Sequence, residues 1–465
     1  MPDPSACLPA LLALLPALPP PEAPAAWNLP IESVIPFAVL LLAIAILPLA
    51  ASHWWEHNRN KLIVALACGL PVGIYVWIKA HQLNLPFDLH SHPILIAMHE
   101  YAAFILLLFA LFAISGGIYL RGTLAGTPTV NTAMLAIGGL IASLVGTTGA
   151  SMLLIRPLLR ANAVRRRKVH VVVFFIFVVS NCGGLLTPLG DPPLFLGFLK
   201  GVPFTWTFAL WKEWLLVNSV LLVAFQFLDS WCFHREDVEE KRRDLDEAVE
   251  RARVPLGVEG SFNFLLLGGV IATIYCSGRF QWPAGAQEAA MLALALASIF
   301  LTPAAIRARN QFTYAPIVEV AFLFLGIFLA MIPALRILNE RGAELGVTST
   351  RSFFWATGVL SSFLDNAPTY LTFASIACGL SQVAPDGRYL ADFLAQGGDS
   401  AAILAAISCG AVFMGANTYI GNGPNFMVKA IAESSGVKMP SFFGYMGWST
   451  IVLVPLFVVI TFTFF

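Results

Sequence analysis

The chain reads Gly146-Thr-Thr-Gly-Ala-Ser151 inside one apolar segment and Ser180-Asn-Cys-Gly-Gly-Leu-Leu-Thr-Pro-Leu-Gly-Asp-Pro-Pro193 inside the next. A similar pair occurs in the second half, where Leu364-Asp-Asn-Ala-Pro-Thr369 is followed by Asn417-Thr-Tyr-Ile-Gly-Asn-Gly-Pro-Asn425. A helix that breaks inside a membrane leaves backbone groups without partners, and lipid cannot replace those partners. Such breaks persist where they line a cavity or hold a ligand, so the two pairs predict a transport site.

Composition predicts the fold class. Hydrophobic residues make up 58% of the 465 residues and charged residues 12%, about half the charged fraction of a typical soluble domain. Several apolar stretches approach the roughly 20 residues that span a bilayer. They cover residues 33–51, 61–80, 94–120, 208–231, 262–275, 287–301, 315–335 and 444–465. We therefore expect an all-α polytopic membrane protein, and the net charge of zero argues against nucleic acid as a partner.

The seven cysteines are scattered and mostly lie in apolar stretches. They show neither zinc-site nor disulfide spacing, so we interpret them as small hydrophobic residues. The amino-terminal residues 1–30 allow two interpretations. An apolar run over residues 7–18 and the sequence Ala23-Pro-Ala25 fit a cleaved signal segment, whereas the absence of a positively charged start favours a Pro/Ala-rich tail.

Basic residues in the loops predict the orientation. They cluster at residues 156–168, at residues 235–253 and at Arg307 and Arg309, and the positive-inside rule places all three clusters in the cytoplasm. The loops near residues 81–92, 201–207 and 278–285 carry little positive charge, as expected outside the cell. We therefore expect the helix at residues 33–51 to enter from the outside.

A charged stretch divides the chain into halves. Residues 233–256 have the mixed charges of a solvated cytoplasmic linker, which leaves residues 31–232 and 257–465 as two units. Each unit holds three crossings, a segment with a polar middle, a broken crossing and a final crossing. If the polar-middle segment is a re-entrant hairpin, each half crosses five times. An odd number of crossings predicts two inverted-topology repeats, as in many secondary transporters.

The lengths of the apolar arms support the hairpins. Residues 131–145 and 152–159 flank the first polar stretch, and residues 353–363 and 370–380 flank the second. Each arm is too short to cross a bilayer alone. A single kinked crossing remains the alternative, because transmembrane helices tolerate Gly and Pro.

The side chains at the four interruptions are hard oxygen donors, which suit alkali cations better than soft metals. The candidate ion-binding residues are Thr147, Thr148, Ser151, Asn181, Asp191, Asp365, Asn366, Thr369, Asn417, Thr418, Asn422 and Asn425. No Arg or Lys lies within the interruptions. Asp191 and Asp365 could therefore share a sodium ion, and burial and mutual repulsion would let them take protons when it leaves. The alternative is that Asp191 only caps a helix and that Asp365 only hydrogen-bonds the local backbone.

These motifs resemble the ion-transporter superfamily, together with Leu154-Ile-Arg-Pro157, Arg160-Ala-Asn162 and the Tyr that follows Thr369. Within it the chain is most similar to sodium/proton antiporters and citrate transporters of the CitMHS-like type, from about Ile35 to the end. The resemblance implies a scaffold domain, a mobile transport domain, dimers and elevator-type motion. It also implies two half-sites, Thr147, Thr148, Asn181 and Asp191 in one and Asp365, Asn366, Asn417 and Thr418 in the other.

The chain departs from the superfamily at one motif. Dicarboxylate carriers typically carry Ser-Asn-Thr in both halves, whereas this sequence has Ser180-Asn-Cys182 and Ala416-Asn-Thr418. The departure argues against a di- or tricarboxylate substrate and leaves the cation interpretation in place.

Three further signals carry less weight. His53-Trp-Trp-Glu-His57 matches an inverted zinc-peptidase motif but lies in a short loop beside an aromatic belt. His90, His92 and His99 with Glu100 could form a surface metal site or pH sensor, although solvated loop histidines are the simpler interpretation. Glu319 lies in an apolar stretch and is either a second proton carrier or a side chain that reaches the cytoplasmic interface.

The first hypothesis is a transporter that exchanges sodium or lithium for protons, with no cofactor beyond these ions. The alternatives are a cation-coupled symporter for citrate or another organic acid and, more distantly, a membrane-embedded hydrolase. The expected partners are a small inorganic cation, protons, the lipid bilayer and a second copy of the chain. We expect a multi-pass protein of the bacterial inner membrane.

Overall fold

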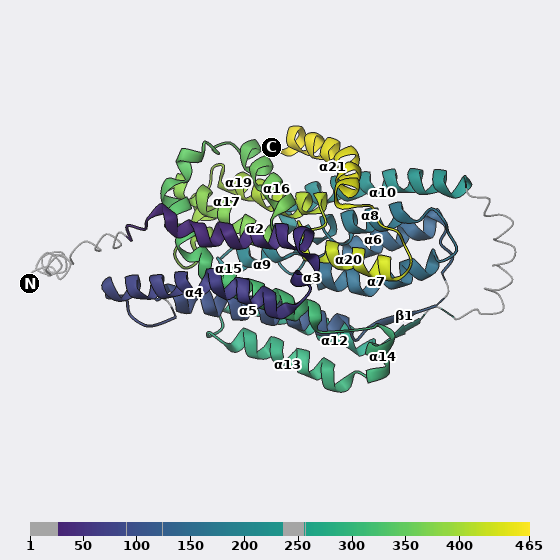
Figure 1. Cartoon of the computed structure of the whole chain (residues 1–465), viewed down its shortest axis with the longest axis horizontal. Helices are drawn as coiled ribbons and strands as arrows, with labels where there is room; N and C mark the ends of the chain where they lie inside the picture. Colours follow the sequence, from purple (N-terminus) through teal and green to yellow (C-terminus); the bar gives the residue numbers. More distant parts are fainter. Residues whose placement is uncertain (1–26, 90, 123, 236–254, 256) are drawn as a thin grey trace, which may run out of the picture.

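The computed structural model describes residues 27–89, 91–122, 124–235, 255 and 257–465. Within this part of the chain, ten helical segments are long and apolar enough to cross a membrane. The expected all-α polytopic membrane fold is thus observed (Figure 1). The possible signal segment and most of the charged linker lie outside the described residues.

The first half begins with a short 3-10 turn and alternates long helices with two interrupted ones. Its elements are η2 (Ile31–Val34), α2 (Ile35–Ala50), α3 (Ser52–Trp55), α4 (Asn58–Gln82), α5 (Pro93–Ser115), β1 (Tyr119–Arg121), α6 (Pro128–Val145), α7 (Thr147–Ala161), α8 (Val169–Val178), η3 (Cys182–Leu186), α9 (Pro192–Leu199), η4 (Trp206–Leu210) and α10 (Trp211–His234). Proline occupies the first turn of α2, α5, α6 and α9, where its missing N–H costs nothing.

The second half has nearly the same order of elements. They are β2 (Gly257–Glu259), α12 (Phe262–Phe280), α13 (Ala286–Leu301), α14 (Ala304–Arg309), α15 (Ala315–Arg341), η5 (Gly342–Leu345), α16 (Thr350–Phe363), α17 (Asn366–Leu380), α18 (Tyr389–Ala395), α19 (Ser400–Met414), η6 (Gly415–Asn417), α20 (Gly423–Ser434) and α21 (Phe442–Phe464). The predicted crossing at residues 287–301 is α13, which is shorter than the ten spanning segments.

A small ribbon joins the two halves at one end of the molecule (Figure 1). Strands β1 and β2 pair antiparallel, with Leu120 opposite Val258. The predicted apolar stretch at residues 94–120 therefore ends as a helix at Ser115 and finishes in a strand. The ribbon fixes the ends of α5 and α12 next to each other.

Helices α4 and α15 pack at close range because glycines meet between them. A Cβ atom on Gly326 would lie 2.5 Å from the carbonyl oxygen of Ala65, and one on Gly69 would lie 2.9 Å from the Cα of Gly326. Together with α5, α12 and α13, these helices form one layer of the molecule. Helices α6–α10 and α16–α21 form the other.

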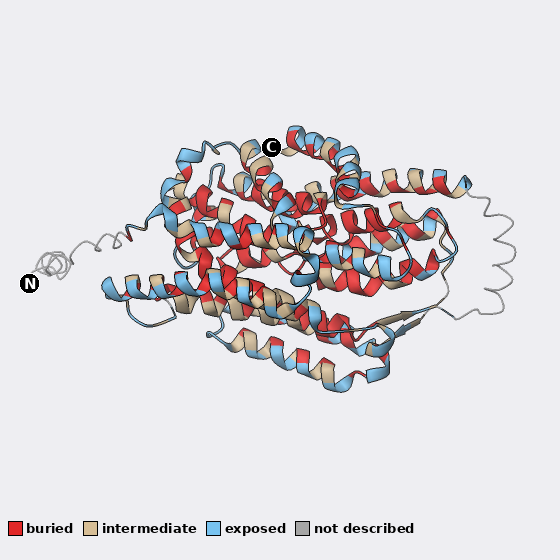
Figure 2. Ribbon diagram, viewed as in Figure 1, coloured by how far each residue is buried: buried red, intermediate tan, exposed pale blue. Residues whose placement is uncertain are grey.

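The interrupted helices are the most enclosed part of the fold. Burial reaches 89% of the spanning window that contains α8 and η3 and 78% of the window that contains α19 and η6, against at most 50% in the other eight (Figure 2). The other helices expose apolar side chains such as Phe227, Phe300 and Ile451, as expected of surfaces that face lipid. The two breaks therefore lie inside the protein, where protein groups can satisfy the freed backbone.

Candidate ion-binding site at the interrupted helices

The two interrupted helices are held by matching hydrogen bonds. In the first half, the Thr187 hydroxyl donates to the carbonyl of Ser143 in α6 and accepts from the N–H of Leu189. In the second half, the Thr418 hydroxyl donates to the carbonyl of Ser362 in α16 and accepts from the backbone of the next turn. In both halves a threonine at the break thus ties the interrupted helix to the helix before the neighbouring polar stretch, α6 or α16.

Glycine allows the backbone to fold back on itself at both breaks. A Cβ atom on Gly190 would lie 1.9 Å from the carbonyl oxygen of Gly184, and one on Gly421 would lie 2.5 Å from that of Gly415. No side chain fits at these distances. The loops between η3 and α9 and between η6 and α20 are consequently compact, and both lead directly into a new helix.

The polar stretch between α6 and α7 also contains a helix start. Gly146 has a φ of 82°, a conformation that favours glycine, and α7 begins at the next residue. The N–H of Thr147 donates to the carbonyl of Gly190 at 2.8 Å. The start of α7 therefore lies against the break in the first interrupted helix.

Asp191 lies at the point where four helices begin. Its side chain is 1% exposed and accepts three hydrogen bonds from side chains. Oδ1 accepts from Thr147 Oγ1 at 2.9 Å and from Asn422 Nδ2 at 3.0 Å, and Oδ2 accepts from Asn366 Nδ2 at 2.5 Å. These residues stand at the starts of α7, α9, α17 and α20, so both halves contribute to one carboxylate environment.

The structure shows a local backbone hydrogen bond at Asp365 and no capping hydrogen bond from the Asp191 side chain. Asp191 occupies the position before α9 but makes no capping hydrogen bond with its side chain. Asp365 is half-buried, and its Oδ1 accepts the N–H of Ala367 at 3.0 Å as the cap of α17. Asn366, the residue after Asp365, bonds Asp191 directly. The two carboxylates thus share one region with different local roles.

Amides connect the halves beside Asp191. Asn181 Nδ2 donates to Asn425 Oδ1 at 2.7 Å, and Asn422 Nδ2 lies 3.2 Å from Asn181 Oδ1. Asn425 Nδ2 in turn donates to the carbonyls of Gly415 and Thr418 at 2.9 Å. Asn425 thus holds the freed backbone of its own break and contacts the other break through Asn181.

The remaining candidate residues have more local partners. The Ser151 and Ser180 hydroxyls are 2.8 Å apart, and Thr369 donates to the carbonyl of Asp365 within its own helix turn. Thr148 is half-buried next to Thr147. Asn417 Nδ2 donates to Ser362 Oγ at 2.9 Å. Of the predicted set, Thr147, Asn366 and Asn422 are thus the residues that contact Asp191 directly.

Two amide oxygens at this site have no hydrogen-bond partner in the described part of the chain. They are Oδ1 of Asn366 and Oδ1 of Asn417, and both atoms are buried. Among the described residues, no salt bridge includes Asp191 or Asp365. The unpartnered oxygen of Asn366 belongs to the amide that bonds Asp191, a carboxylate that no base neutralises among the described residues. Oxygen donors of this kind suit a hard cation.

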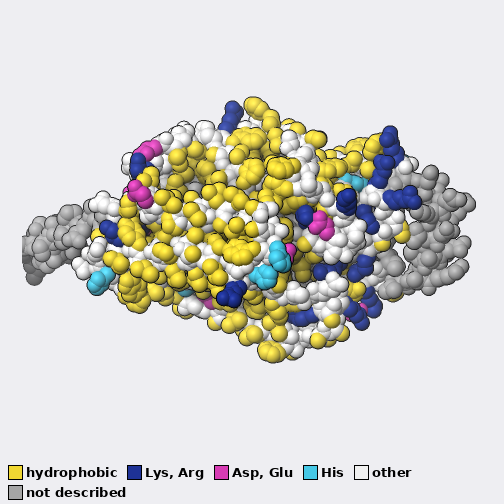
Figure 3. Space-filling view, in the orientation of Figure 1, with side chains coloured by type: hydrophobic (Ala, Val, Ile, Leu, Met, Phe, Trp, Pro, Cys, Tyr) yellow, Lys and Arg dark blue, Asp and Glu magenta, His cyan; other side chains and the backbone are white. Residues whose placement is uncertain are grey.

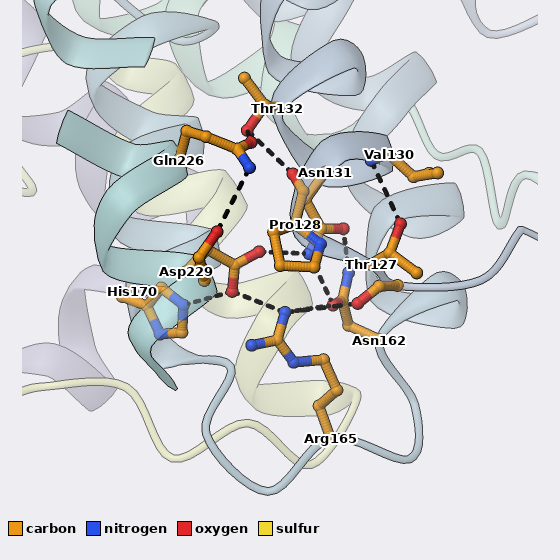
Figure 4. A network of polar contacts seen from close by, with 12 residues as sticks. Thr127, Pro128, Val130, Asn131, Thr132, Asn162, Arg165, His170, Gln226 and Asp229 are labelled. Atoms are coloured by element: carbon orange, nitrogen blue, oxygen red, sulfur yellow. Dashed lines mark hydrogen bonds and ion pairs between the residues drawn. The ribbon is translucent and has the colours of Figure 1, made fainter. Parts of the chain in front are cut away.

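A second buried polar network lies near the ends of α6 and α10, and the sequence analysis missed it (Figure 4). Asp229 is fully buried, 2.6 Å from Arg165 Nη1, 2.7 Å from His170 Nε2 and 2.9 Å from Asn131 Nδ2. Asn131 also exchanges hydrogen bonds with Asn162 at 3.0 and 2.7 Å. Asp229 is an acid within an apolar helix, so the rule that singled out Glu319 could have found it.

The other acids singled out in the sequence have basic partners. Glu319 lies 2.8 Å from Lys61 Nζ across the interface between α15 and α4. Glu100 is buried against Lys200 Nζ at 2.6 Å, so its interpretation as part of an exposed histidine cluster is wrong. Glu100 lies in α5 and Lys200 follows α9. The two partners are 100 residues apart in the sequence.

Two of the expected loop histidines are also not free in solvent. His92 is 4% exposed, and His99 lies 3.6 Å from Glu288. His90 lies outside the described residues. In the loop with the zinc-peptidase motif, exposed His53 and Glu56 are 3.8 Å apart. In the part of the chain that the structure describes, no group of three or more His, Cys, Asp or Glu side chains is placed to hold a metal ion.

The ten long apolar segments define a multi-pass membrane protein among the described residues, with two enclosed breaks at its centre. A family model described as "Putative citrate transport" matches residues 26–465, and the chain belongs to this family. No curated protein matches the chain. The protein is therefore a member of a transporter family, as the motifs indicated.

Proposed function

We propose that this protein is a secondary active transporter that exchanges sodium or lithium for protons through the site around Asp191. The observation that carries the proposal is a fully enclosed carboxylate that both halves bond and that no base neutralises among the described residues. Its neighbours are neutral amides and a hydroxyl. A buried carboxylate in such surroundings holds either a proton or a cation, because an uncompensated charge is costly there.

Competition between the two occupants would couple their movements. When a cation binds, Asp191 and Asp365 stay ionised, and the unpartnered oxygens of Asn366 and Asn417 are available as further ligands. When the cation leaves, protonation removes the repulsion between the carboxylates. Each transition exchanges one kind of positive charge for the other. The transporter then needs no basic residue at the site.

We also propose that residues 31–232 and 257–465 are inverted repeats with re-entrant hairpins α6–α7 and α16–α17. Reciprocal packing supports this, because α4 packs on α15 as α13 packs on α5, and α2 packs on α15 as α12 packs on α5. The matching bonds of Thr187 and Thr418 support it as well. In this proposal α2–α5 and α12–α15 form the scaffold of a homodimer, and the remaining helices carry the site in an elevator-type movement.

A cation-coupled symporter for citrate or another organic acid is the second candidate. The family description favours it. The convergence of four helix starts on Asp191 also favours negative groups, since helix N-termini carry partial positive charge. A carboxylate substrate would nevertheless approach two acids without an intervening base. It would therefore need bound cations or protons at Asp191 and Asp365 first.

Transport in membrane vesicles distinguishes the two candidates. Everted vesicles loaded with a pH-sensitive acridine dye should release protons when sodium or lithium is added, and potassium serves as the matched cation. Labelled citrate uptake is measured in the same vesicles. Sodium-driven citrate uptake without proton release would reject the exchanger and support the symporter.

A further inference from the structure

A basic pocket opens beside the ribbon end of the molecule, away from the breaks. Its volume is about 340 Å³, and it lies between the end of α7, the start of α8, the end of α14 and the link from α20 to α21. Four of its lining residues are basic: Arg156, Arg160, Lys168 and Arg309. None of its lining residues is acidic. Figure 3 shows that Lys and Arg side chains gather toward this end of the molecule.

Only one of the four basic groups has an acidic partner among the described residues. Arg309 forms a pair of bonds with Glu259, at 2.9 and 2.7 Å. Arg160 Nη2 donates to the carbonyl of Leu120, and Lys168 Nζ donates to a carbonyl five residues back. These are neutral acceptors. At least three positive charges therefore meet at the pocket with one carboxylate nearby.

Arg156 is the strongest sign that something binds here. Its Nε and Nη1 atoms are buried, and neither has a hydrogen-bond partner in the described part of the chain. Buried guanidinium donors without acceptors are costly, so they normally have partners. Arg156 also lies one helical turn before Arg160, where like charges repel. An anion in the pocket would satisfy these donors and offset the repulsion.

We propose that this pocket binds a phosphate group. Arginine forks match the oxygens of phosphate, and a phosphate with more than one charge suits several convergent cations. The volume exceeds that of a bare phosphate and leaves room for the group that carries it, next to apolar Leu159 and Val437. Basic pockets between helices on the cytoplasmic side bind lipid headgroups. The carrier is accordingly an anionic lipid or a free phosphorylated molecule.

The location gives the bound phosphate a structural consequence. Arg156 and Arg160 belong to the α6–α7 hairpin, whereas Arg309 ends α14 beside the ribbon. One phosphate would thus contact both layers of the molecule. This inference concerns binding alone and does not depend on which ion or acid the protein transports.

Thermal unfolding of the purified full chain tests the proposal with two probes. Pyrophosphate is titrated in detergent, and in parallel the protein is moved into nanodiscs of phosphatidylcholine with or without phosphatidylglycerol. Potassium chloride at equal ionic strength is the control that tests for a general salt effect. We expect stabilisation by pyrophosphate or by phosphatidylglycerol, and the active probe identifies the source of the phosphate.

Variants connect the effect to the pocket. Arg156→Gln should lower the apparent affinity for the stabilising probe at least tenfold. Lys168→Gln gives a second test if Arg156→Gln fails to fold. Arg59→Gln removes an equal charge from an exposed position in the first turn of α4 and should leave binding unchanged. Stabilisation by neither probe, equal stabilisation by potassium chloride, or an equal effect in Arg59→Gln and the pocket variants would overturn the assignment.

Discussion

The geometry around Asp191 predicts that charge and shape can be separated by substitution. In Asp191→Asn the amide oxygen can keep the two bonds at the Oδ1 position, from Thr147 and Asn422. The new amide nitrogen would face the Nδ2 atom of Asn366. A flip of the Asn366 side chain resolves that conflict, because its own Oδ1 is unpartnered in the described structure and can accept.

The expected energies follow from these three bonds. A hydrogen bond to a charged group contributes about 1.5–3 kcal/mol and a neutral one about 0.5–1.5 kcal/mol, so neutralisation weakens the set by roughly 3 kcal/mol. Removal of a buried charge offsets this by several kcal/mol. The free energy of unfolding of Asp191→Asn should therefore stay within about 2 kcal/mol of the natural protein. Asp191→Leu leaves three donors unsatisfied and should lose roughly 3–9 kcal/mol.

Although Asp191→Asn should leave the stability nearly unchanged, it should abolish transport. One unit charge about 4 Å from a cation contributes about 4 kcal/mol at an effective dielectric constant near 20, or roughly 1000-fold in affinity. Sodium-dependent proton release from everted vesicles should therefore disappear, while thermal unfolding in detergent stays near normal. Glu344→Gln, in an exposed ion pair, is the control. Undiminished exchange in Asp191→Asn, or normal stability in Asp191→Leu, would refute this reasoning.

Three further predictions test neighbouring features. Asp365→Asn should abolish exchange yet leave a folded dimer on size-exclusion chromatography, because asparagine also caps helices; retained exchange would remove this residue from the mechanism. Gly190→Ala places a Cβ 1.9 Å from a backbone oxygen and should cost more than about 2 kcal/mol in detergent unfolding assays, whereas Gly268→Ala, with open space around it, should not. Asp229→Asn leaves buried arginine and histidine partners uncompensated and should cost about 3–5 kcal/mol, against less than about 1 kcal/mol for Asp386→Asn in a more exposed pair; similar losses would contradict the buried network.

Much of the site could be predicted from the sequence because the residues that break and restart helices act on their immediate neighbours. Glycine and proline end and restart helices within a few residues, so the helix starts at Thr147, Pro192, Asn366 and Gly423 follow from the four polar stretches. The same reasoning named Asp191 and Asp365 as the acids inside the breaks. It could not decide which of them caps a helix, because that depends on which donors other segments supply.

The sequence by itself determined the membrane class, the spans and the positions of the breaks, since apolar length and backbone chemistry fix these without reference to distant residues. Tertiary structure alone decided that Asn366 and Asn422 bond Asp191 from the other half of the chain. It also decided that Glu100 finds Lys200 and that Asp229 finds Arg165. The partners in these pairs are separated by 64 to more than 200 residues. A local sequence pattern does not reveal which distant side chains will pack against a buried charge.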